Sequence, residues 1–390
     1  MRRFLFVVPP LAGHTLPTVH IGQELVARGH DVAWTGYAEA VGSLLPAGAR
    51  LFALDGAADR ESVEAAKARS RGLRGAAAFE FLWQDFLLPL ARSMAPGVSA
   101  AVDAYRPDVV VVDQQALAGA VVARQRGLPW ATSATTSAEL VDPFTLLPKL
   151  GEWARRCQYE LQLELGVSDV DARRGDLRFS EHLVLAFTTE ALVGPLDRFP
   201  DHYAFVGPSI GVRRVPVDFP WSDLDPDRPL VLASLGTVNR DVGGRFLTAV
   251  VEAAEPLEVQ LVLVAEPADL AAPPPHVLVR RFVPQLDLLP RTSVVVSHAG
   301  HNTVCESLAH GVPLLLAPIR DDQPIVAEQV VAAGAGIRVR FGRVGAAELR
   351  EALRTLLTDP TYRTAAARVQ ASFAAAGGAA AGADRLEKLA

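Results

Sequence analysis

A histidine, a glycine, an asparagine and a threonine stand close together in one short stretch of the chain, at His298, Gly300, Asn302 and Thr303. The apolar run before them, residues 293–297, is rich in valine and is typical of a buried parallel strand, and residues 304–310 fit a short helix. A helix that follows a strand directly turns its free N–H groups toward the end of that strand, where they favour an anion. Gly300 allows close approach of the backbone, and the polar side chains add donors, so this loop fits a diphosphate.

The same stretch also has a purely structural interpretation. Thr303 and Glu306 match a capping box, in which the two side chains only satisfy backbone N–H groups at the start of a helix. Asn302 is a good helix cap for the same reason. Taken by itself, this stretch supports anion binding and helix capping about equally.

A histidine and an aspartate in the first half of the chain form a second candidate pair. His14 follows the apolar run Phe4–Val8, so it stands at the end of a strand, where α/β proteins bind ligands, and Asp113 ends the valine run 109–112. A histidine takes up a proton near neutral pH, and a carboxylate partner fixes its tautomer, so the pair suits proton abstraction from a hydroxyl. Alternatively, His14 makes an ordinary loop hydrogen bond and Asp113 caps a helix at 114–126.

The elements that carry these residues alternate along the chain. Strand-like runs alternate with helical patterns such as Leu16–Arg28, which is typical of parallel sheets covered by helices. The runs form two series, which are Phe4–Val8, Asp31–Thr35, Val109–Val112, Pro129–Thr132 and Leu183–Phe187, and then Leu230–Ser234, Gln260–Val264, Val277–Val279, Val294–Val296 and Pro313–Ala317. We predict an α/β protein with domains 1–207 and 229–370, a proline-rich linker at 208–228 and a helical tail at 371–390.

The composition excludes several classes of function. A net charge of −6 gives no basic footprint for a nucleic acid. Two cysteines, Cys157 and Cys305, rule out a disulfide framework and a cysteine-rich zinc site. No apolar run approaches the roughly twenty residues that cross a bilayer, so we expect no integral membrane segment and a cytoplasmic protein. No GxGxxG fingerprint follows the first strand, which disfavours a nicotinamide oxidoreductase.

Several motifs follow one another in a fixed order, namely Phe282-Val283-Pro-Gln285, His298 through Glu306, Gly311-Val-Pro313 and Asp322-Gln323. Together they resemble the donor signature of the UDP-glycosyltransferase superfamily, family 1, and most closely its bacterial natural-product and macrolide-antibiotic branch. The resemblance extends over nearly the whole chain, because the segment around Gly13-His14 matches as well. It implies the GT-B architecture, with two facing Rossmann-like domains and an active site in the cleft between them, and a tail at 371–390 that packs back on the first domain.

The resemblance also implies a set of donor-binding residues, which are Ser234, Gly236, Thr237, Phe282, Val283, Gln285, His298, Gly300, Asn302, Thr303, Glu306, Asp322 and Gln323. Among them, Phe282 would stack on the base, Glu306 would bind the ribose hydroxyls, and the pair Asp322–Gln323 would hold the sugar hydroxyls. The chain departs from the family at Val326, where asparagine is usual, and at Phe282, where tryptophan is usual. These departures leave the identity of the sugar open.

The activity implied by the resemblance is that of an enzyme, an inverting glycosyltransferase. It would move a hexose or deoxyhexose from a UDP- or dTDP-sugar to a hydroxyl of a lipophilic small-molecule natural product, without a metal or other cofactor, as a monomer or homodimer. His14 would act as the general base, supported by Asp113. Aromatic residues would wall the acceptor pocket, although each ring could instead belong to the core, and the candidates are Phe81, Trp83, Phe86 and Phe144. A nucleotide-sugar epimerase of the same fold and a non-catalytic glycosyltransferase-like activator stay open as alternatives.

Overall fold

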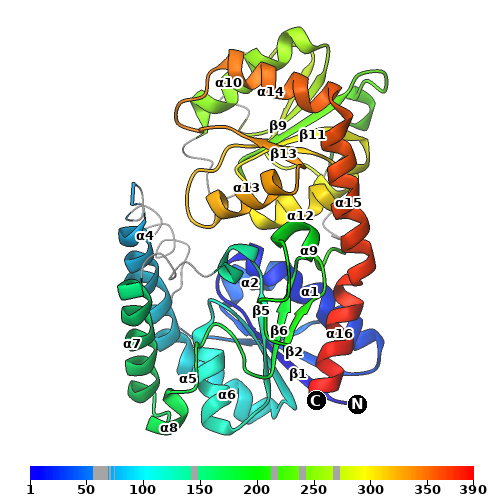
Figure 1. Ribbon diagram of the computed structural model, residues 1–390. Helices are drawn as coiled ribbons and strands as arrows, with labels where there is room; N and C mark the ends of the chain where they lie inside the picture. The colour runs from blue at the N-terminus through cyan, green and yellow to red at the C-terminus, as the bar shows by residue number, and fades with distance from the viewer. Residues whose placement is uncertain are drawn as a thin grey trace. The chain divides into compact units, whose positions relative to one another are not determined.

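The computed structural model in Figure 1 describes residues 1–55, 69, 72–73, 75–141, 148–211, 218–236, 243–266 and 273–390. The chain divides into two compact units. The first comprises Met1–Phe187, Asp197–Ile210 and Ala376–Ala390, and the second comprises Thr188–Leu196 and Gly211–Ala375. These limits differ from the predicted boundaries at 207, 228 and 370. The main difference is the short segment Thr188–Leu196, which leaves the first unit and packs with the second.

The first unit is built on a seven-stranded sheet in which every pairing is parallel. Its strands are β1 (Arg3–Val7), β2 (Asp31–Gly36), β3 (Arg50–Ala53), β4 (Val109–Asp113), β5 (Trp130–Ala134), β6 (Leu183–Ala186) and β7 (Tyr203–Phe205). Their order is β3-β2-β1-β4-β5-β6-β7, so the direction in which the sheet grows reverses between β1 and β4. In α/β sheets, ligands bind beside the carboxyl ends of the strands at such a reversal.

Helices cover both faces of this sheet (Figure 1). Alternate residues of β1 serve the two cores: Phe4 and Phe6 pack with α1 and α16, whereas Leu5 and Val7 pack with α5 and α6. The helices are α1 (Ala12–Ala27), α2 (Ala38–Val41), α4 (Ala76–Phe81), α5 (Leu88–Tyr105), α6 (Leu117–Arg126), α7 (Pro148–Glu164), α8 (Asp169–Ala172) and α16 (Gly378–Leu389). A π-helical segment, η2 (Leu82–Leu87), joins α4 to α5, and two 3₁₀ turns are η1 (Gly42–Leu44) and η3 (Ser137–Leu140).

The second unit repeats this plan with six parallel strands. These are β8 (Leu230–Ser234), β9 (Gln260–Val264), β10 (Val277–Arg280), β11 (Thr292–Ser297), β12 (Leu314–Leu316) and β13 (Gly336–Arg338), in the order β10-β9-β8-β11-β12-β13. The helices are α9 (Glu190–Val193), α10 (Gly244–Ala254), α11 (Gln285–Leu288), α12 (His301–Ala309), α13 (Gln323–Ala332), α14 (Ala346–Thr358) and α15 (Pro360–Ala376), with 3₁₀ turns η4 (Trp221–Asp223), η5 (Glu255–Leu257) and η7 (Leu289–Arg291). Across the described ranges, no helix is long and apolar enough to span a membrane.

Two parallel sheets covered by helices confirm the predicted α/β fold class. Three strands were missed, namely β3, β7 and β13, and each lies at an edge of its sheet. The first helix begins at Ala12 rather than at Leu16. His14 therefore lies in the first turn of α1 and not in the loop before it.

Charged side chains connect the last helix, α16, to α1 and the residues that follow it within the first unit. Arg28 donates hydrogen bonds to Asp384 at 2.6 Å and to Glu387 at 2.8 Å. His30 lies beside the same carboxylate, with Nε2 at 2.7 Å from Glu387. Ala383 and Leu386 of α16 add apolar contacts to the core that α1 shares with β1.

Candidate active site

In the first unit, adjacent strands bring the predicted His14–Asp113 pair together. β1 pairs with β4 through Val7 and Val112, so the loop after β1 and the last residue of β4 meet at the reversal of the sheet. Nδ1 of His14 lies 2.9 and 3.0 Å from the two carboxylate oxygens of Asp113. The carboxylate is fully buried, while the imidazole keeps 16% of its surface exposed. The pair therefore has a buried anion behind a histidine that reaches solvent.

A threonine that the sequence reasoning missed completes this cluster. Thr135 follows β5, the neighbour of β4, and its hydroxyl donates to Asp113 at 3.0 Å and lies 2.7 Å from Nδ1 of His14. Because the carboxylate and the threonine oxygen are both acceptors for Nδ1, that nitrogen carries the proton of the neutral ring. Nε2 is then the unprotonated nitrogen of the ring. This is the tautomer that a general base requires.

Asp113 also performs part of the structural role considered above. Its Oδ1 accepts a hydrogen bond from the backbone N–H of Gln115 at 2.9 Å, which shapes the turn after β4. It is not the cap of the next helix, because α6 begins at Leu117 and its cap position is Ala116. Three donors, from His14, Thr135 and Gln115, thus converge on one buried carboxylate. Such a carboxylate is held in one orientation.

In the second unit, the loops after β8 and β11 form the corresponding position, since Ser234 pairs with Ser297 across these strands. The imidazole of His298 lies between two glycines. A Cβ atom at Gly236 would lie 2.7 Å from its Cε1, and a Cβ atom at Gly300 would lie 2.5 Å from its Nε2. Gly236 also has a φ of +71°, which side-chain-bearing residues rarely adopt. Both glycines are therefore needed to seat this ring.

The imidazole of His298 is neutral at physiological pH. Burial lowers its pKa to about 4; a backbone hydrogen bond with Ser234 opposes this shift, and the positive charge of Arg320 adds to it. Its Nδ1 is buried and has no hydrogen-bond partner in the described part of the chain. A buried nitrogen without a partner is costly, and a ligand oxygen or hydroxyl would satisfy it.

The cationic neighbour, Arg320, lies in the loop between β12 and α13, and the sequence reasoning did not single it out. Strands β11 and β12 are paired, and the N–H of Ala317 donates to the carbonyl of Ser297 at 2.8 Å, so the loops that follow them are adjacent. Each loop contains one residue with a side chain and a positive φ, Ala299 at 70° and Asp321 at 55°. Uncommon backbone conformations of this kind concentrate at ligand-binding loops.

The helix after His298 does not use the predicted capping box. α12 begins at His301 after the cap position Gly300, which places Asn302 and Thr303 in its first turn. Glu306 instead accepts a hydrogen bond from the side-chain amide of Gln285 at 2.6 Å. The capping interpretation is therefore wrong for Thr303 and Glu306, and the first-turn N–H groups of α12, which have no acceptor within the helix, are directed at the loop.

The predicted base-binding segment precedes α11. Phe282 is 53% exposed, an unusual position for a large aromatic ring, and the guanidinium of Arg281 lies 5.6 Å from its centre. Val283 follows it, and Gln285 begins α11 and ties this segment to Glu306. The aromatic ring and the carboxylate predicted for base and ribose are thus linked through one amide.

The Asp322–Gln323 pair opens helix α13. Asp322 is the cap position of the helix, and the buried Gln323 accepts hydrogen bonds at Oε1 from the N–H groups of Ile319 and Arg320, at 2.9 and 3.1 Å. The carbonyl oxygen of Gln323 therefore holds its own loop, and only its amide N–H groups are left for a ligand. Val326 is fully buried, so this position packs in the core.

The predicted acceptor aromatics do not share one environment. Phe81 and Phe86 are half-buried, whereas Trp83 is fully buried and its ring lies 5.7 Å from the guanidinium of Arg178. Trp83 is a core residue and lines no open surface, which corrects its predicted place in the pocket wall. Phe144 and Thr237 lie outside the described residues. Among the residues that the structure describes, no group of three or more His, Cys, Asp or Glu side chains is placed to hold a metal ion.

Comparison with known proteins shows the family of this chain. Residues 224–372 match the family model described as "UDP-glucoronosyl and UDP-glucosyl transferase". A demethyllactenocin mycarosyltransferase from Streptomyces fradiae is 31% identical over 406 residues, which cover 100% of this chain and 87% of that protein. The chain belongs to the UDP-glycosyltransferase superfamily.

Two further similarities place this glycosyltransferase within the superfamily. A 4'-demethylrebeccamycin synthase from Lentzea aerocolonigenes is 28% identical over 405 residues, which cover 96% of each protein. The crystal structure of a kitacinnamycin glycotransferase matches with a TM-score of 0.80 and 27% identity, over 100% of this chain and 99% of that one. The protein is thus a nucleotide-sugar-dependent glycosyltransferase with the GT-B fold, in the natural-product antibiotic branch.

Proposed function

We propose that this glycosyltransferase inverts configuration while moving a hexose or deoxyhexose from a UDP- or dTDP-sugar to a hydroxyl of a lipophilic natural product. One observation carries the proposal: His14 is fixed by Asp113 and Thr135 in the tautomer that leaves Nε2 unprotonated. The half-exposed aromatic rings Phe81 and Phe86 of the same unit suit an apolar acceptor.

In the proposed reaction, Nε2 of His14 takes the proton of the acceptor hydroxyl. The acceptor oxygen attacks the anomeric carbon from the side opposite the diphosphate, a new C–O bond forms, and the bond between that carbon and the phosphate oxygen breaks. The imidazolium that results is stabilised by the buried carboxylate of Asp113. The nucleoside diphosphate leaves with the electron pair of the broken bond, so configuration at the sugar carbon inverts.

The charge of the leaving diphosphate needs hydrogen-bond donors and positive charge, and the second unit offers both. The N-terminus of α12 directs its first-turn N–H groups toward the loop, with the side chains of Asn302 and Thr303 in the same turn. His298 is neutral and contributes hydrogen bonding rather than charge. Arg320 is therefore the full positive charge that we assign to the diphosphate. With these groups we expect transfer without a metal ion or other cofactor, and activity unchanged by EDTA.

Donor recognition follows from the remaining side chains. Phe282 would stack on the uracil or thymine ring, and Glu306, oriented by Gln285, would accept hydrogen bonds from the ribose hydroxyls. Asp322 would accept from the hydroxyls of the sugar while the amide of Gln323 donates, because the carbonyl of Gln323 is already engaged. This division favours a sugar that presents both a donor and an acceptor on one edge.

The natural-product acceptor is supported by the relatives, one a 4'-demethylrebeccamycin synthase and another a demethyllactenocin mycarosyltransferase. These names concern chemically different aglycones, so they support a lipophilic acceptor without choosing its skeleton. The nucleobase and the sugar of the donor must likewise be identified by experiment.

The first test measures the thermal unfolding midpoint with UDP, dTDP, GDP or NAD, each added separately without metal. A ligand at one hundred times its dissociation constant adds about 2.7 kcal/mol, which raises the midpoint by a few degrees. We expect a shift with UDP or dTDP that disappears in Glu306→Ala and persists in Glu328→Ala, whose carboxylate is exposed on the same unit. No shift with either nucleotide would remove the donor site and favour the activator alternative.

The second step identifies the reaction by product analysis with the nucleotide-sugar that stabilises the protein. A glycosylated acceptor of inverted configuration supports the proposal. Conversion of the nucleotide-sugar without any acceptor would instead indicate an epimerase.

A further inference from the structure

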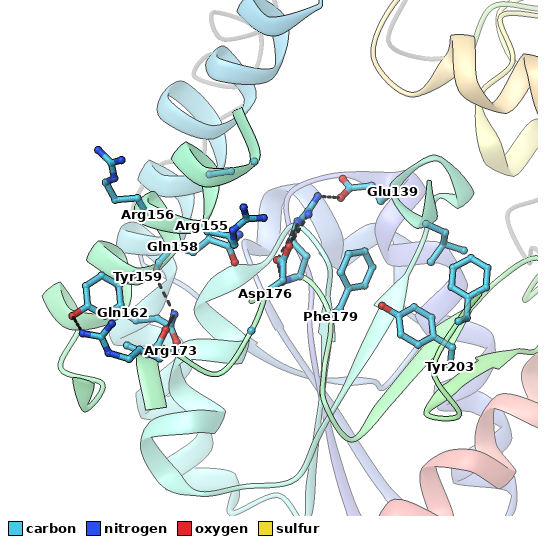
Figure 2. Close-up of a pocket in the computed structure, with 17 residues that line it drawn as sticks. Glu139, Arg155, Arg156, Gln158, Tyr159, Gln162, Arg173, Asp176, Phe179 and Tyr203 are labelled. Carbon is cyan, nitrogen blue, oxygen red and sulfur yellow. Dashed lines mark hydrogen bonds and ion pairs between the residues drawn. The ribbon is translucent and has the colours of Figure 1, made fainter. Parts of the chain in front are cut away.

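The first unit contains a cavity that none of the residues assigned to transfer lines. Its volume is about 690 Å³, within the range of sites for drug-sized molecules. It lies against α7 on one side and β7 on the other, with the segment before β6 forming its floor (Figure 2). Its wall combines one aromatic end with a set of charged side chains.

The aromatic end consists of Phe179, Phe199 and Tyr203. The ring centres of Phe179 and Phe199 lie 6.0 and 5.5 Å from that of Tyr203. The phenol of Tyr203 forms no hydrogen bond with the described part of the chain, and burial raises its pKa to about 12, with a further contribution from the charge of Asp176. It is therefore a protonated hydroxyl that is available as a donor inside the cavity.

The floor is already satisfied by its own ion pairs. Arg178 is buried and donates to Asp176 at 2.6 Å and to Glu139 at 2.8 Å, while its guanidinium lies over the ring of Phe179. The buried amide of Gln158 accepts from the N–H of Leu177 at 2.7 Å. These groups hold the wall in shape and have no capacity left to neutralise a ligand's charge.

A cation on α7 is different. Arg155 lines the cavity and makes neither a hydrogen bond nor an ion pair with the described residues. It lies one helical turn from Gly151 and Gln158, which also line the cavity, so it shares their face of α7. In Figure 2 its guanidinium lies toward Asp176, and the neighbouring Arg156 lines the cavity as well.

We propose that this cavity is a second ligand site, which binds a flat aromatic molecule bearing a carboxylate or similar anion. The rings pack against Phe179 and Phe199, the anion pairs with Arg155, and the hydroxyl of Tyr203 donates a hydrogen bond. The proposal does not require the donor site, because His298 and its loop belong to the other unit.

The test uses naphthoate as the anionic probe and naphthylmethanol as its uncharged counterpart, with dissociation constants measured by calorimetry on the full chain. Wild type should bind naphthoate more tightly than naphthylmethanol. Arg155→Glu should weaken naphthoate by roughly fivefold or more and leave naphthylmethanol unchanged. Phe199→Ala should weaken both probes by roughly tenfold, because it removes the shared ring contact.

Lys149→Glu is the matched control, since it makes the same charge change at an exposed residue of α7 that does not line the cavity. It should leave both constants within about twofold, as expected of a screened surface charge. Equal losses of naphthoate affinity in the two glutamate variants would show that the general electrostatic field of the protein causes the effect, and would disprove the proposed site. Absence of naphthoate binding to wild type would disprove it as well. Stabilisation by UDP or dTDP, measured on the same samples, reports the donor site separately and shows that each variant is folded.

Discussion

The two units have the same strand order around their central reversal, yet they place opposite chemistry there. After β1 and β4 the first unit carries a closed network, in which His14, Asp113 and Thr135 satisfy one another. After β8 and β11 the second unit carries an open arrangement, with the buried imidazole of His298 between two glycines and its Nδ1 unpaired among the residues that the structure describes.

This difference shows how one topology serves two functions. A base must have a fixed tautomer before substrate arrives, so its hydrogen bonds are made within the protein. A diphosphate site must instead direct donors at the ligand, so the loop presents helix N–H groups, small residues and a neutral ring. The polar groups of the first unit therefore stabilise it locally. In the second unit the buried nitrogen of His298 lowers local stability, and a bound ligand would restore it.

The strongest test of the comparison is His14→Ala. Loss of the base should lower kcat by roughly a hundredfold to ten-thousandfold, because a positioned general base contributes that much. Stabilisation by UDP or dTDP should be unchanged, since the donor residues belong to the other unit. Steady-state kinetics and thermal shift measure the two effects on the same preparation.

Two controls sharpen this test. His20→Ala removes a histidine from the same helix whose Nδ1 lies 2.9 Å from the carbonyl of Ser209, and it should keep most of the activity. Asp113→Asn keeps the size of the side chain and should cost less than loss of His14. Near-normal turnover in His14→Ala would disprove the assignment of the base.

A smaller effect concerns acid stability, to which the buried His298 should contribute. The unfolded histidine titrates near its ordinary pKa of 6.5, whereas the folded one stays neutral until about pH 4. Between these values the unfolded state binds a proton that the folded state does not, so stability falls as pH drops from 6.5 to 4. The difference of 2.5 units between these pKa values corresponds to about 3 kcal/mol.

Urea unfolding of wild type and His298→Asn at a series of pH values measures this contribution. The variant should lose about 3 kcal/mol less than wild type between pH 6.5 and 4. His182→Asn, an exposed histidine of the first unit, is the control and should follow wild type. Parallel curves for wild type and His298→Asn would show that the ring is not held neutral.

The sequence predicted the central strands well because buried parallel strands are continuous apolar runs. It missed β3, β7 and β13 because edge strands of three or four residues are half-exposed and lack such a run. Site residues at the ends of central strands, such as His14 and Asp113, were predictable for the same reason: strand ends meet at the reversal of the sheet.

Contacts between distant side chains were not predictable from local pattern. Thr135 joins the base network from a third strand, and nothing in its own neighbourhood marks it. Glu306 fits a capping box by spacing, yet its partner is Gln285, twenty-one positions away. The position of Trp83 in the sequence suggests a wall of the acceptor pocket, but its ring packs against the guanidinium of Arg178. In each case the deciding partner is distant in sequence.

Gly236 illustrates the same lesson and gives the smallest predicted effect. Gly236→Ala places a Cβ atom 2.7 Å from Cε1 of His298 at a backbone φ of +71°, so the ring or the loop must move. A displacement of this kind costs about 1–2 kcal/mol, and UDP or dTDP should bind roughly tenfold more weakly. Calorimetric titration measures the change, and kcat at saturating donor should fall much less than in His14→Ala.

The matched control for this last test is Gly244→Ala, because an added Cβ there meets nothing within 4 Å and the residue opens helix α10. Its nucleotide affinity should equal that of wild type. If Gly236→Ala also binds nucleotide normally, the ring of His298 is not the surface that the diphosphate contacts. The two glycines would then serve only to pack the ring of His298. The base network of the first unit would be the one functional arrangement left in the comparison.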